Sequence, residues 1–371
     1  MTLKLVIIVG TRPEIIRLSA TINLCRKLFN TTLIHTGQNY DKNLNQVFFD
    51  DLNINPPDVY FNCLNTNCGA MIGELITKSY DFLLLHKPDA ILILGDTNSC
   101  LSAYSAKRLK IPIFHLEAGN RAFDPNVPEE INRKIIDHLS DINMCYMEHA
   151  RTNLLNENCK PQFTFVIGSP MKEIYSNVKD KIDNSNILNK YNLNNGDYFV
   201  WSTHREDNLD NENNFSLMME SLFNLSKKYN KKIIFGAHPR AMNKIKNLNI
   251  NDNNIIITEP FGILDYYKLL LNSILVISDS GTISEESNIL GIKSILLRYS
   301  TEHPETIDSG SIIISNINWT NLQISIDTSL ILSNSHNEII NYNDTNFSEK
   351  VCKIISGYHS IVNKMIWMKN T

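Results

Sequence analysis

The side chains best suited to acid and base chemistry stand where short apolar runs of this sequence end. An aspartate follows such a run in LILGDTNSC, and a glutamate follows one in PIFHLEAGNRAFD. Two glutamates lie behind a proline in NVPEEINRK, and a histidine precedes an arginine in STHRED. Carboxylates and a histidine brought together can transfer protons, although a carboxylate at a helix start can also be only a cap or a dipole partner. The candidates are Asp96, Glu117 followed by Arg121, Glu129, and His204 with Arg205.

Anion binding is indicated by LVISDSGTISEES, residues 275–287. An apolar strand runs into a Ser-Gly-Thr turn and then into a helix start, where Ser280 and Gly281 would offer backbone N–H groups to a phosphate. Glu286 would then accept a hydrogen bond from a sugar hydroxyl one turn further on. The alternative is a capped helix that binds nothing, with Ser280 or Thr282 as N-cap and Glu285 as the capping-box partner.

A further cation follows the first apolar run, in GTRPE at residues 10–14. Pro13 suits the first turn of a helix, so Arg12 lies at a helix N-terminus, which favours anions; an ion pair with a nearby carboxylate is the alternative. The segment has one glycine where a dinucleotide fingerprint has three, so a nicotinamide-dependent dehydrogenase is disfavoured. His238 and His303 also follow apolar runs, and each fits either a binding edge or a structural role.

These residues need a scaffold of alternating strands and helices. β-branched runs such as residues 5–9, 31–35, 90–94 and 111–115 alternate with amphipathic stretches, and a second series begins at residue 198. This alternation predicts an α/β fold with two Rossmann-like domains, whose parallel sheets face a central cleft that collects the strand-end residues. We expect a first domain over residues 1–168, a second over 169–347, and a terminal helix over 348–371 that packs back on the first.

The composition narrows the function classes. The 371 residues include 35 basic and 39 acidic side chains without a basic run, which disfavours a nucleic-acid partner. The seven cysteines form no CxxC pair and no zinc-type cluster, as in a reduced cytoplasmic protein without a metal site. The apolar stretch at the start is too short to span a membrane and has no cleavage-site character, so no membrane partner is expected.

Taken in order, the segments resemble the non-hydrolysing UDP-N-acetylglucosamine 2-epimerase family. The resemblance covers nearly the whole chain, and it implies the GT-B arrangement of two domains around a deep cleft, with acid/base carboxylates in the first domain and UDP bound by the second. The matching pieces are GTRPE at 10–14, GDT at 95–97, EAG at 117–119, PEE at 128–130, HR at 204–205, HP at 238–239, DSG at 279–281, EE at 285–286 and PE at 304–305.

The resemblance also implies a reaction without a cofactor. Members of the family invert carbon 2 of a UDP-linked N-acetylamino sugar by eliminating UDP to a 2-acetamidoglycal and adding it back. Asp96, Glu117 and Glu129 would form the acid/base group, with His204 assisting at the departing diphosphate. The implied substrate contacts are Arg12, Arg17, Arg121, Arg205, His238, Tyr266 near the uracil, Ser280 and Gly281 at the phosphates, Glu286 at the ribose, and His303. The implied partners are the UDP-sugar and a second copy of the chain, because family members are usually homodimers.

The departures from the family pattern bear on the substrate. Arg17 stands where the family commonly has lysine, and His303 stands where it commonly has arginine. EAGNR and STHRED are more similar to the branch that forms UDP-N-acetyl-L-fucosamine, for bacterial surface polysaccharide such as O-antigen or capsule, from a UDP-2-acetamido-2,6-dideoxy-L-hexose. The alternatives are a UDP-GlcNAc/UDP-ManNAc 2-epimerase, a GT-B glycosyltransferase that uses a UDP-sugar, a hydrolysing relative, and a non-catalytic nucleotide-sugar binding module.

Overall fold

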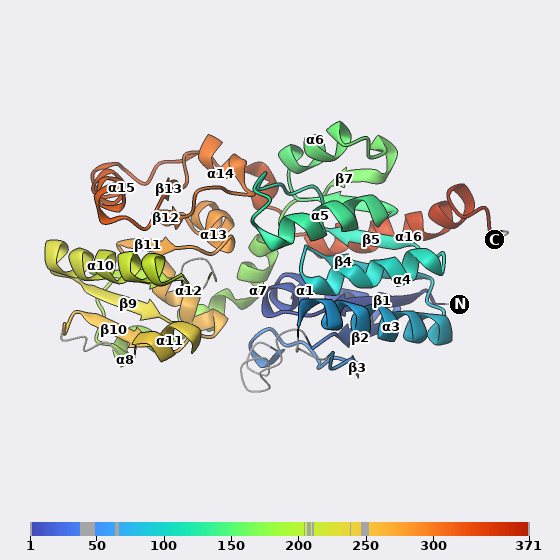
Figure 1. The fold of residues 1–371 in the computed structure, drawn as a ribbon, viewed down its shortest axis with the longest axis horizontal. Helices are drawn as coiled ribbons and strands as arrows, with labels where there is room; N and C mark the ends of the chain where they lie inside the picture. Colours follow the sequence, from blue (N-terminus) through green and yellow to red (C-terminus); the bar gives the residue numbers. More distant parts are fainter. Residues whose placement is uncertain are drawn as a thin grey trace. The chain divides into compact units, whose positions relative to one another are not determined.

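The computed structural model describes residues 2–37, 49–63, 67–203, 205, 209, 211–237, 239–245 and 252–369, and divides into two compact units. The first unit comprises Met1–Ser176 and Asn343–Thr371, and the second comprises Asn177–Tyr342 (Figure 1). The helix α7 (Met171–Asp183) carries the chain from the first unit into the second. The sequence predicted these two boundaries between the units at 168/169 and 347/348, and the structure has them at 176/177 and 342/343.

The first unit is built on a parallel sheet of seven strands in the order β3-β2-β1-β4-β5-β6-β7. The register pairs Leu5 of β1 with Thr31 of β2 on one side and with Ala90 of β4 on the other. From β1 the chain adds β2 and β3 on one side, and then crosses to the other side of β1 to form β4 to β7. The topological switch point of the sheet therefore lies between β1 and β4. The strands are β1 (Lys4–Val9), β2 (Asn30–His35), β3 (Val59–Tyr60), β4 (Ala90–Leu94), β5 (Ile113–Leu116), β6 (Ile142–Cys145) and β7 (Thr164–Val166).

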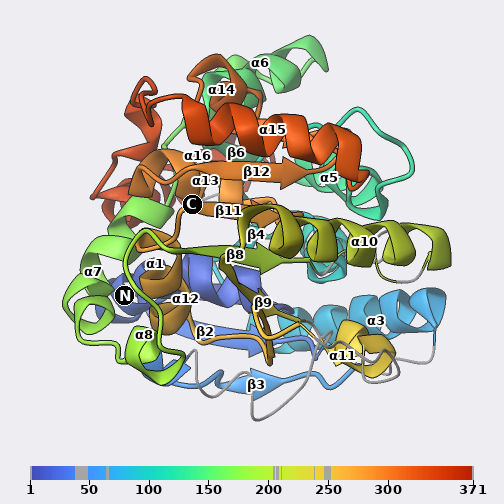
Figure 2. The ribbon, with the colours of Figure 1, turned by 90° about the vertical axis from the view of Figure 1, so that its left-hand side faces the viewer.

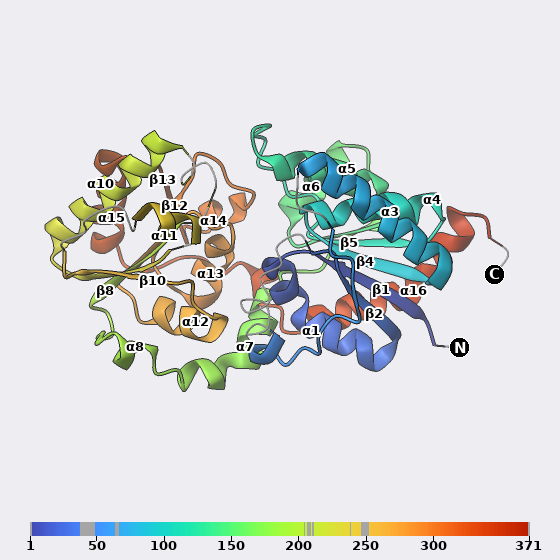
Figure 3. The ribbon, with the colours of Figure 1, turned by 60° about the horizontal axis from the view of Figure 1, so that its bottom comes forward.

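Helices cover both faces of this sheet, because its central strands are apolar on both sides. On one face α3 (Cys68–His86), α4 (Ala103–Arg108) and α5 (Pro128–Leu139) contribute Leu75, Ala106 and Ile136 to a core with the strands. The other face carries α1 (Arg12–Leu28) and the terminal helix α16 (Phe347–Met365) (Figure 3). The hydroxyls of Thr21 and Ser348 lie 3.2 Å apart between those two helices. The remaining elements are a 3₁₀ turn (Asn98–Ser102), α6 (Glu148–Asn156) and a second 3₁₀ turn (Pro161–Phe163).

The second unit repeats this plan with a parallel sheet of six strands in the order β10-β9-β8-β11-β12-β13. Trp201 and Ile277 on its strands form a core with Leu222 of α10 and Leu322 of α15, on the face that Figure 2 turns toward the reader. The strands are β8 (Tyr198–Ser202), β9 (Lys232–Gly236), β10 (Ile255–Thr258), β11 (Leu275–Ser278), β12 (Ser294–Leu297) and β13 (Ile313–Ser315). The helices are α8 (Ile187–Lys190), α10 (Glu212–Tyr229), α11 (Pro239–Ile245), α12 (Ile263–Leu271), α13 (Thr282–Leu290), α14 (Pro304–Asp308) and α15 (Trp319–Ile331), with a 3₁₀ turn at Ile340–Tyr342. The predicted α/β fold with two parallel sheets is confirmed.

Candidate functional site

Asp96 lies two residues after the end of β4, and two side chains of α5 hold it. Its carboxylate Oδ2 accepts a 2.7 Å hydrogen bond from Arg133 Nε, and its backbone carbonyl accepts one of 2.8 Å from Asn132 Nδ2. The side chain is 20% exposed, so it stands at the surface of the site and not in the core. Because β4 and β5 are neighbouring parallel strands, this end of β4 lies beside the segment that carries Glu117.

Glu117 follows β5 in a conformation that few side chains adopt. Its backbone φ is 63°, in the left-handed region, which costs of the order of 1–3 kcal/mol for a residue other than glycine. Its Oε2 lies 3.7 Å from Arg17 Nε, and the Arg17 guanidinium lies 5.7 Å from the centre of the Tyr146 ring. A strained backbone of this kind persists only where neighbouring groups hold the residue in place. For Glu117, the buried Arg17 is such a neighbour.

The glycine of the EAG segment, Gly119, is required by its backbone conformation and by its close neighbours. Its φ is 84°, and a Cβ atom at this position would lie 2.2 Å from the Ala150 carbonyl oxygen. Its N–H lies 3.2 Å from Oδ1 of the buried Asp137. No side chain fits between this turn and α6, so the turn that carries Glu117 is fixed against its neighbours.

The two glutamates at the start of α5 have different surroundings. Glu130 is buried, pairs with Arg133 at 2.9 Å, and accepts hydrogen bonds from the N–H groups of Ala122 and Phe123. Glu129 is half-buried, and its carboxylate has no hydrogen-bond or ion-pair partner within the described part of the chain. Glu130 therefore holds the loop after β5, and Glu129 remains available for chemistry.

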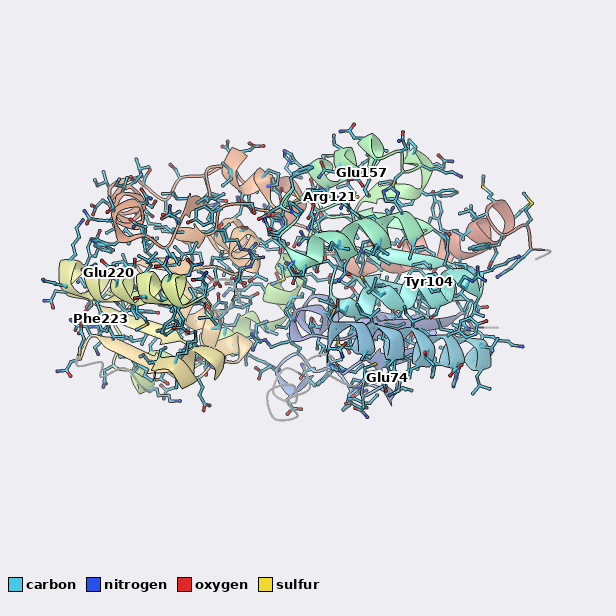
Figure 4. The ribbon with its side chains drawn as sticks, in the orientation of Figure 1. Glu74, Tyr104, Arg121, Glu157, Glu220 and Phe223 are labelled. Carbon is cyan, nitrogen blue, oxygen red and sulfur yellow. The ribbon has the colours of Figure 1, made fainter. Side chains whose placement is uncertain are left out.

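Arg121 is fully buried in a charge cluster below these loops. Its guanidinium donates to Glu157 at 2.8 and 2.7 Å and to Asp137 at 2.7 Å (Figure 4). Burial alone would lower the pKa of Arg121, but the two carboxylates outweigh it and raise the pKa. Burial would raise the pKa of Asp137, but His115 and Arg121 hold it below its usual value. These donors are directed at the buried Asp137 and at Glu157, whose side chain is 29% exposed, and the substrate contact expected of Arg121 stays a prediction.

Arg12 occupies the first position of α1, as GTRPE predicts, and is half-buried. Glu14 behind it is buried and accepts hydrogen bonds from the N–H groups of Gly10 (3.0 Å) and Thr11 (2.7 Å) and from the Ser99 hydroxyl. Burial raises the pKa of Glu14, although these hydrogen bonds oppose the shift. Glu14 therefore fixes the backbone at the start of α1, and Arg12 places a positive charge at this helix N-terminus.

The turn after β11 begins α13 as expected, with one difference. Gly281 is the N-cap and makes no side-chain cap, and Glu285 is fully buried, so the capping-box alternative is not found. The Ser280 N–H donates to Ser278 Oγ at 3.1 Å, so the expectation that it is free for a phosphate is wrong. Within the first turn the Ser284 N–H also has an acceptor, the Gly281 carbonyl at 3.3 Å. The N–H groups of Gly281, Thr282 and Ile283 are those for which no acceptor is found among the described residues.

Glu286 and Tyr266 lie together in the second unit. The Tyr266 hydroxyl is 3.4 Å from Glu286 Oε2, and the Glu286 side chain is buried. This pairing brings a carboxylate and an aromatic ring to one place, as a nucleoside site requires.

Two further groups border the turn. Asp279 is buried and accepts a 3.0 Å hydrogen bond from the Arg205 N–H, which fixes the backbone of Arg205. Arg298, which the sequence analysis did not select, donates to the Asp279 carbonyl at 2.7 Å and pairs with Glu302, and its Nη2 lies 3.4 Å from where a Gly281 Cβ would stand. Its position directly after the apolar strand β12 was the signal that could have identified it. His204 and His238 lie outside the described residues.

His303 is buried beside Glu305 and Tyr342. Its Nδ1 lies 3.1 Å from Glu305 Oε1, which also accepts a hydrogen bond from the Tyr342 hydroxyl. Burial alone would lower the pKa of His303, but Glu305, Glu285 and Glu302 raise it to about 9. The imidazole is therefore a cation at neutral pH, paired with the Glu305 carboxylate.

Within the residues that the structure describes, no helix is long and apolar enough to cross a membrane, and no group of histidine, cysteine and carboxylate side chains has the arrangement of a metal site.

Comparison with known proteins gives one consistent family. The family described as UDP-N-acetylglucosamine 2-epimerase matches residues 24–356. The UDP-N-acetylglucosamine 2-epimerase of Methanocaldococcus jannaschii is 35% identical over 364 residues, covering 95% of this chain and 99% of that protein. The UDP-2,3-diacetamido-2,3-dideoxy-D-glucuronate 2-epimerase of Pseudomonas aeruginosa is 30% identical over 322 residues, covering 84% and 88%.

Solved structures give the same result. A UDP-N-acetylglucosamine 2-epimerase from Rickettsia bellii is 41% identical, with a TM-score of 0.93 over 100% of both chains. The M. jannaschii enzyme in complex with UDP-GlcNAc and UDP is 34% identical, with a TM-score of 0.89 over 95% of this chain and 99% of that one.

Proposed function

The chain belongs to the UDP-N-acetylglucosamine 2-epimerase family, and from this premise we propose that it inverts carbon 2 of a UDP-linked N-acetylamino sugar by elimination and re-addition of UDP. The observation that carries the proposal is the carboxylate set of the first unit. Asp96 and Glu117 follow the neighbouring strands β4 and β5, each beside a buried arginine, and Glu129 has no partner in the described structure.

The proposed reaction uses these groups in two steps. In the first, a carboxylate removes the C2 proton, the electron pair of the C–H bond forms the C1=C2 double bond, and the C1–O bond breaks with its pair leaving on UDP. In the second, a carboxyl group on the other face returns a proton to C2 as the UDP oxygen re-forms the bond to C1. Pairs of carboxyl groups suit this exchange because one can accept a proton while the other donates.

The second unit would hold the UDP. The first turn of α13 offers N–H groups to the diphosphate, and Glu286 with Tyr266 offers a carboxylate and a ring to the nucleoside. In this proposal Arg12 and Arg205 contribute cations at the departing diphosphate, where charge develops on the leaving group, and His204 assists there.

Within this class, we propose the 2-epimeric UDP-2-acetamido-2,6-dideoxy-L-hexose as substrate and UDP-N-acetyl-L-fucosamine as product, a precursor of bacterial surface polysaccharide made in the cytoplasm. The departures EAGNR and STHRED support this choice. The names of the relatives above support the UDP-GlcNAc/UDP-ManNAc alternative, so the experiment includes both sugars.

The experiment incubates the purified protein in D₂O with each UDP-sugar in turn and follows the products by NMR. An epimerase places deuterium at C2 of the recovered sugar nucleotide, and an Asp96→Asn variant loses turnover. A glycosyltransferase leaves C2 unlabelled, a hydrolysing relative releases free sugar, and a binding module produces no change, so each of these results contradicts the proposal. Turnover of the D-gluco compound alone would overturn the L-sugar assignment while leaving the epimerase class intact.

We also propose that the chain works as a homodimer. Apolar side chains are exposed on three adjacent helices of one face, among them Tyr104 on α4 (Figure 4), which is 49% exposed, and Ile131 on α5, which is 60% exposed. Exposed apolar side chains of this kind are typical of subunit interfaces. Sedimentation should give twice the mass of one chain, and an Ile131→Lys variant should shift it toward the monomer; a wild-type monomer at micromolar concentration contradicts the proposal.

A further inference from the structure

Arg133 makes a directed contact with Asp96. Its Nε donates to Oδ2 of Asp96 at 2.7 Å, and the Arg133 side chain is only 8% exposed. No contact to Oδ1 of Asp96 is found in the described part of the chain. One oxygen of the carboxylate is thus tethered, and the other is left for chemistry.

Arg133 is itself held in one orientation. Its Nη1 donates to the buried Glu130 at 2.9 Å, so the planar guanidinium is fixed between two carboxylates. A planar guanidinium whose Nη1 is held by Glu130 directs its Nε toward Asp96 more narrowly than a flexible ammonium group would. The orientation of Asp96 therefore depends on the guanidinium geometry as well as on its charge.

The same helix also fixes the backbone of Asp96. Asn132 Nδ2 donates to the Asp96 carbonyl at 2.8 Å and to Asn98 Oδ1 at 3.1 Å. Adjacent residues of α5 thus hold both the main chain and the side chain of one strand-end carboxylate. Both restraints limit the movement of the Asp96 carboxylate relative to β4 and α5.

From this geometry we infer that Arg133 is a positioning residue for the acid/base reaction: it orients the Asp96 carboxylate through Nε without itself touching the sugar. This inference rests on the proposed function. A displacement of a reacting group by about 1 Å can lower the rate about 100-fold, so losing this contact should reduce kcat far more than it changes KM.

The test compares Arg133→Ala, Arg133→Lys and Lys134→Gln with the wild type in steady-state turnover of whichever UDP-sugar the wild type epimerises. Lys134 is the neighbouring exposed cation of α5, so its variant removes the same charge without removing a contact to Asp96. We expect Arg133→Ala to lower kcat about 100-fold with KM within about threefold. We expect Arg133→Lys to recover part of the loss, free guanidinium to raise the rate of Arg133→Ala, and Lys134→Gln to match the wild type.

Arg133→Ala removes the cation that pairs with the buried Glu130 and can prevent folding, so thermal unfolding is measured for each variant. If Arg133→Ala does not fold, the kcat of Arg133→Lys tests the inference. A folded Arg133→Lys with wild-type kcat overturns the inference, as does a loss that appears in KM alone. Absence of turnover by the wild type on every UDP-sugar tested would instead count against the proposed function.

Discussion

Gly119→Ala tests whether the turn that carries Glu117 is fixed by steric contact. Two costs follow from the structure. The residue has a φ of +84°, where an L side chain costs about 1–2 kcal/mol. The added Cβ would also lie 2.2 Å from the Ala150 carbonyl oxygen and 2.8 Å from its carbon, and overpacking of this kind costs about 1–3 kcal/mol more.

Gly95→Ala is the matched control. Gly95 precedes Asp96 and has a φ of +71°, but a Cβ there meets nothing within 4 Å. It therefore carries only the backbone cost of about 1–2 kcal/mol. We expect Gly119→Ala to destabilise the first unit by about 2–5 kcal/mol in total.

Differential scanning calorimetry measures the difference. For a unit of roughly 200 residues, 1 kcal/mol shifts Tm by about 2–4 °C. The transition of the first unit should therefore fall further in Gly119→Ala than in Gly95→Ala. In the folded fraction, kcat should also fall, because relief of the clash moves the chain beside Glu117. A Tm loss in Gly119→Ala no larger than that in Gly95→Ala would refute the steric argument.

Three other predictions test single side chains. Because the folded-state pKa of His303 is about 9, above its usual value of 6.5, the stability that its charge provides is fully present below about pH 6.5 and is lost as pH rises through about 9. Urea unfolding of wild type and His303→Gln from pH 6 to 10 should show a difference of up to about 3 kcal/mol that disappears at high pH; a difference that is constant with pH contradicts the assignment. Glu129→Gln should lower kcat at least about 100-fold with little change in stability, whereas Glu130→Gln should lower Tm; the reverse pattern would mean that their roles are exchanged. Arg121→Gln should destabilise the chain by about 3–5 kcal/mol, because it removes the arginine partner of the buried Asp137, with KM unchanged in the folded fraction; a KM increase without loss of Tm would restore Arg121 to substrate binding.

The layout of strands and helices followed from local residue patterns. Apolar β-branched runs that alternate with amphipathic stretches can bury their side chains only as parallel strands between helices, so the two sheets and their strand ends followed from the pattern. Asp96, Glu117 and Arg12 stand at such ends in the structure, because strand ends are set by local residue types. The two-residue strand β3 was not predicted, because it is too short to form a pattern.

Which polar side chains remain available for a ligand depends on how distant segments pack together. Glu129 and Glu130 are adjacent, yet one is unpaired in the described structure and the other is buried against Arg133. Arg121 has the residue type of a substrate contact, but Glu157, 36 positions away, occupies its guanidinium. Helical periodicity tells which residues share a face, whereas the partner of a charge depends on which distant segment packs against that face. Local patterns cannot specify such long-range pairing.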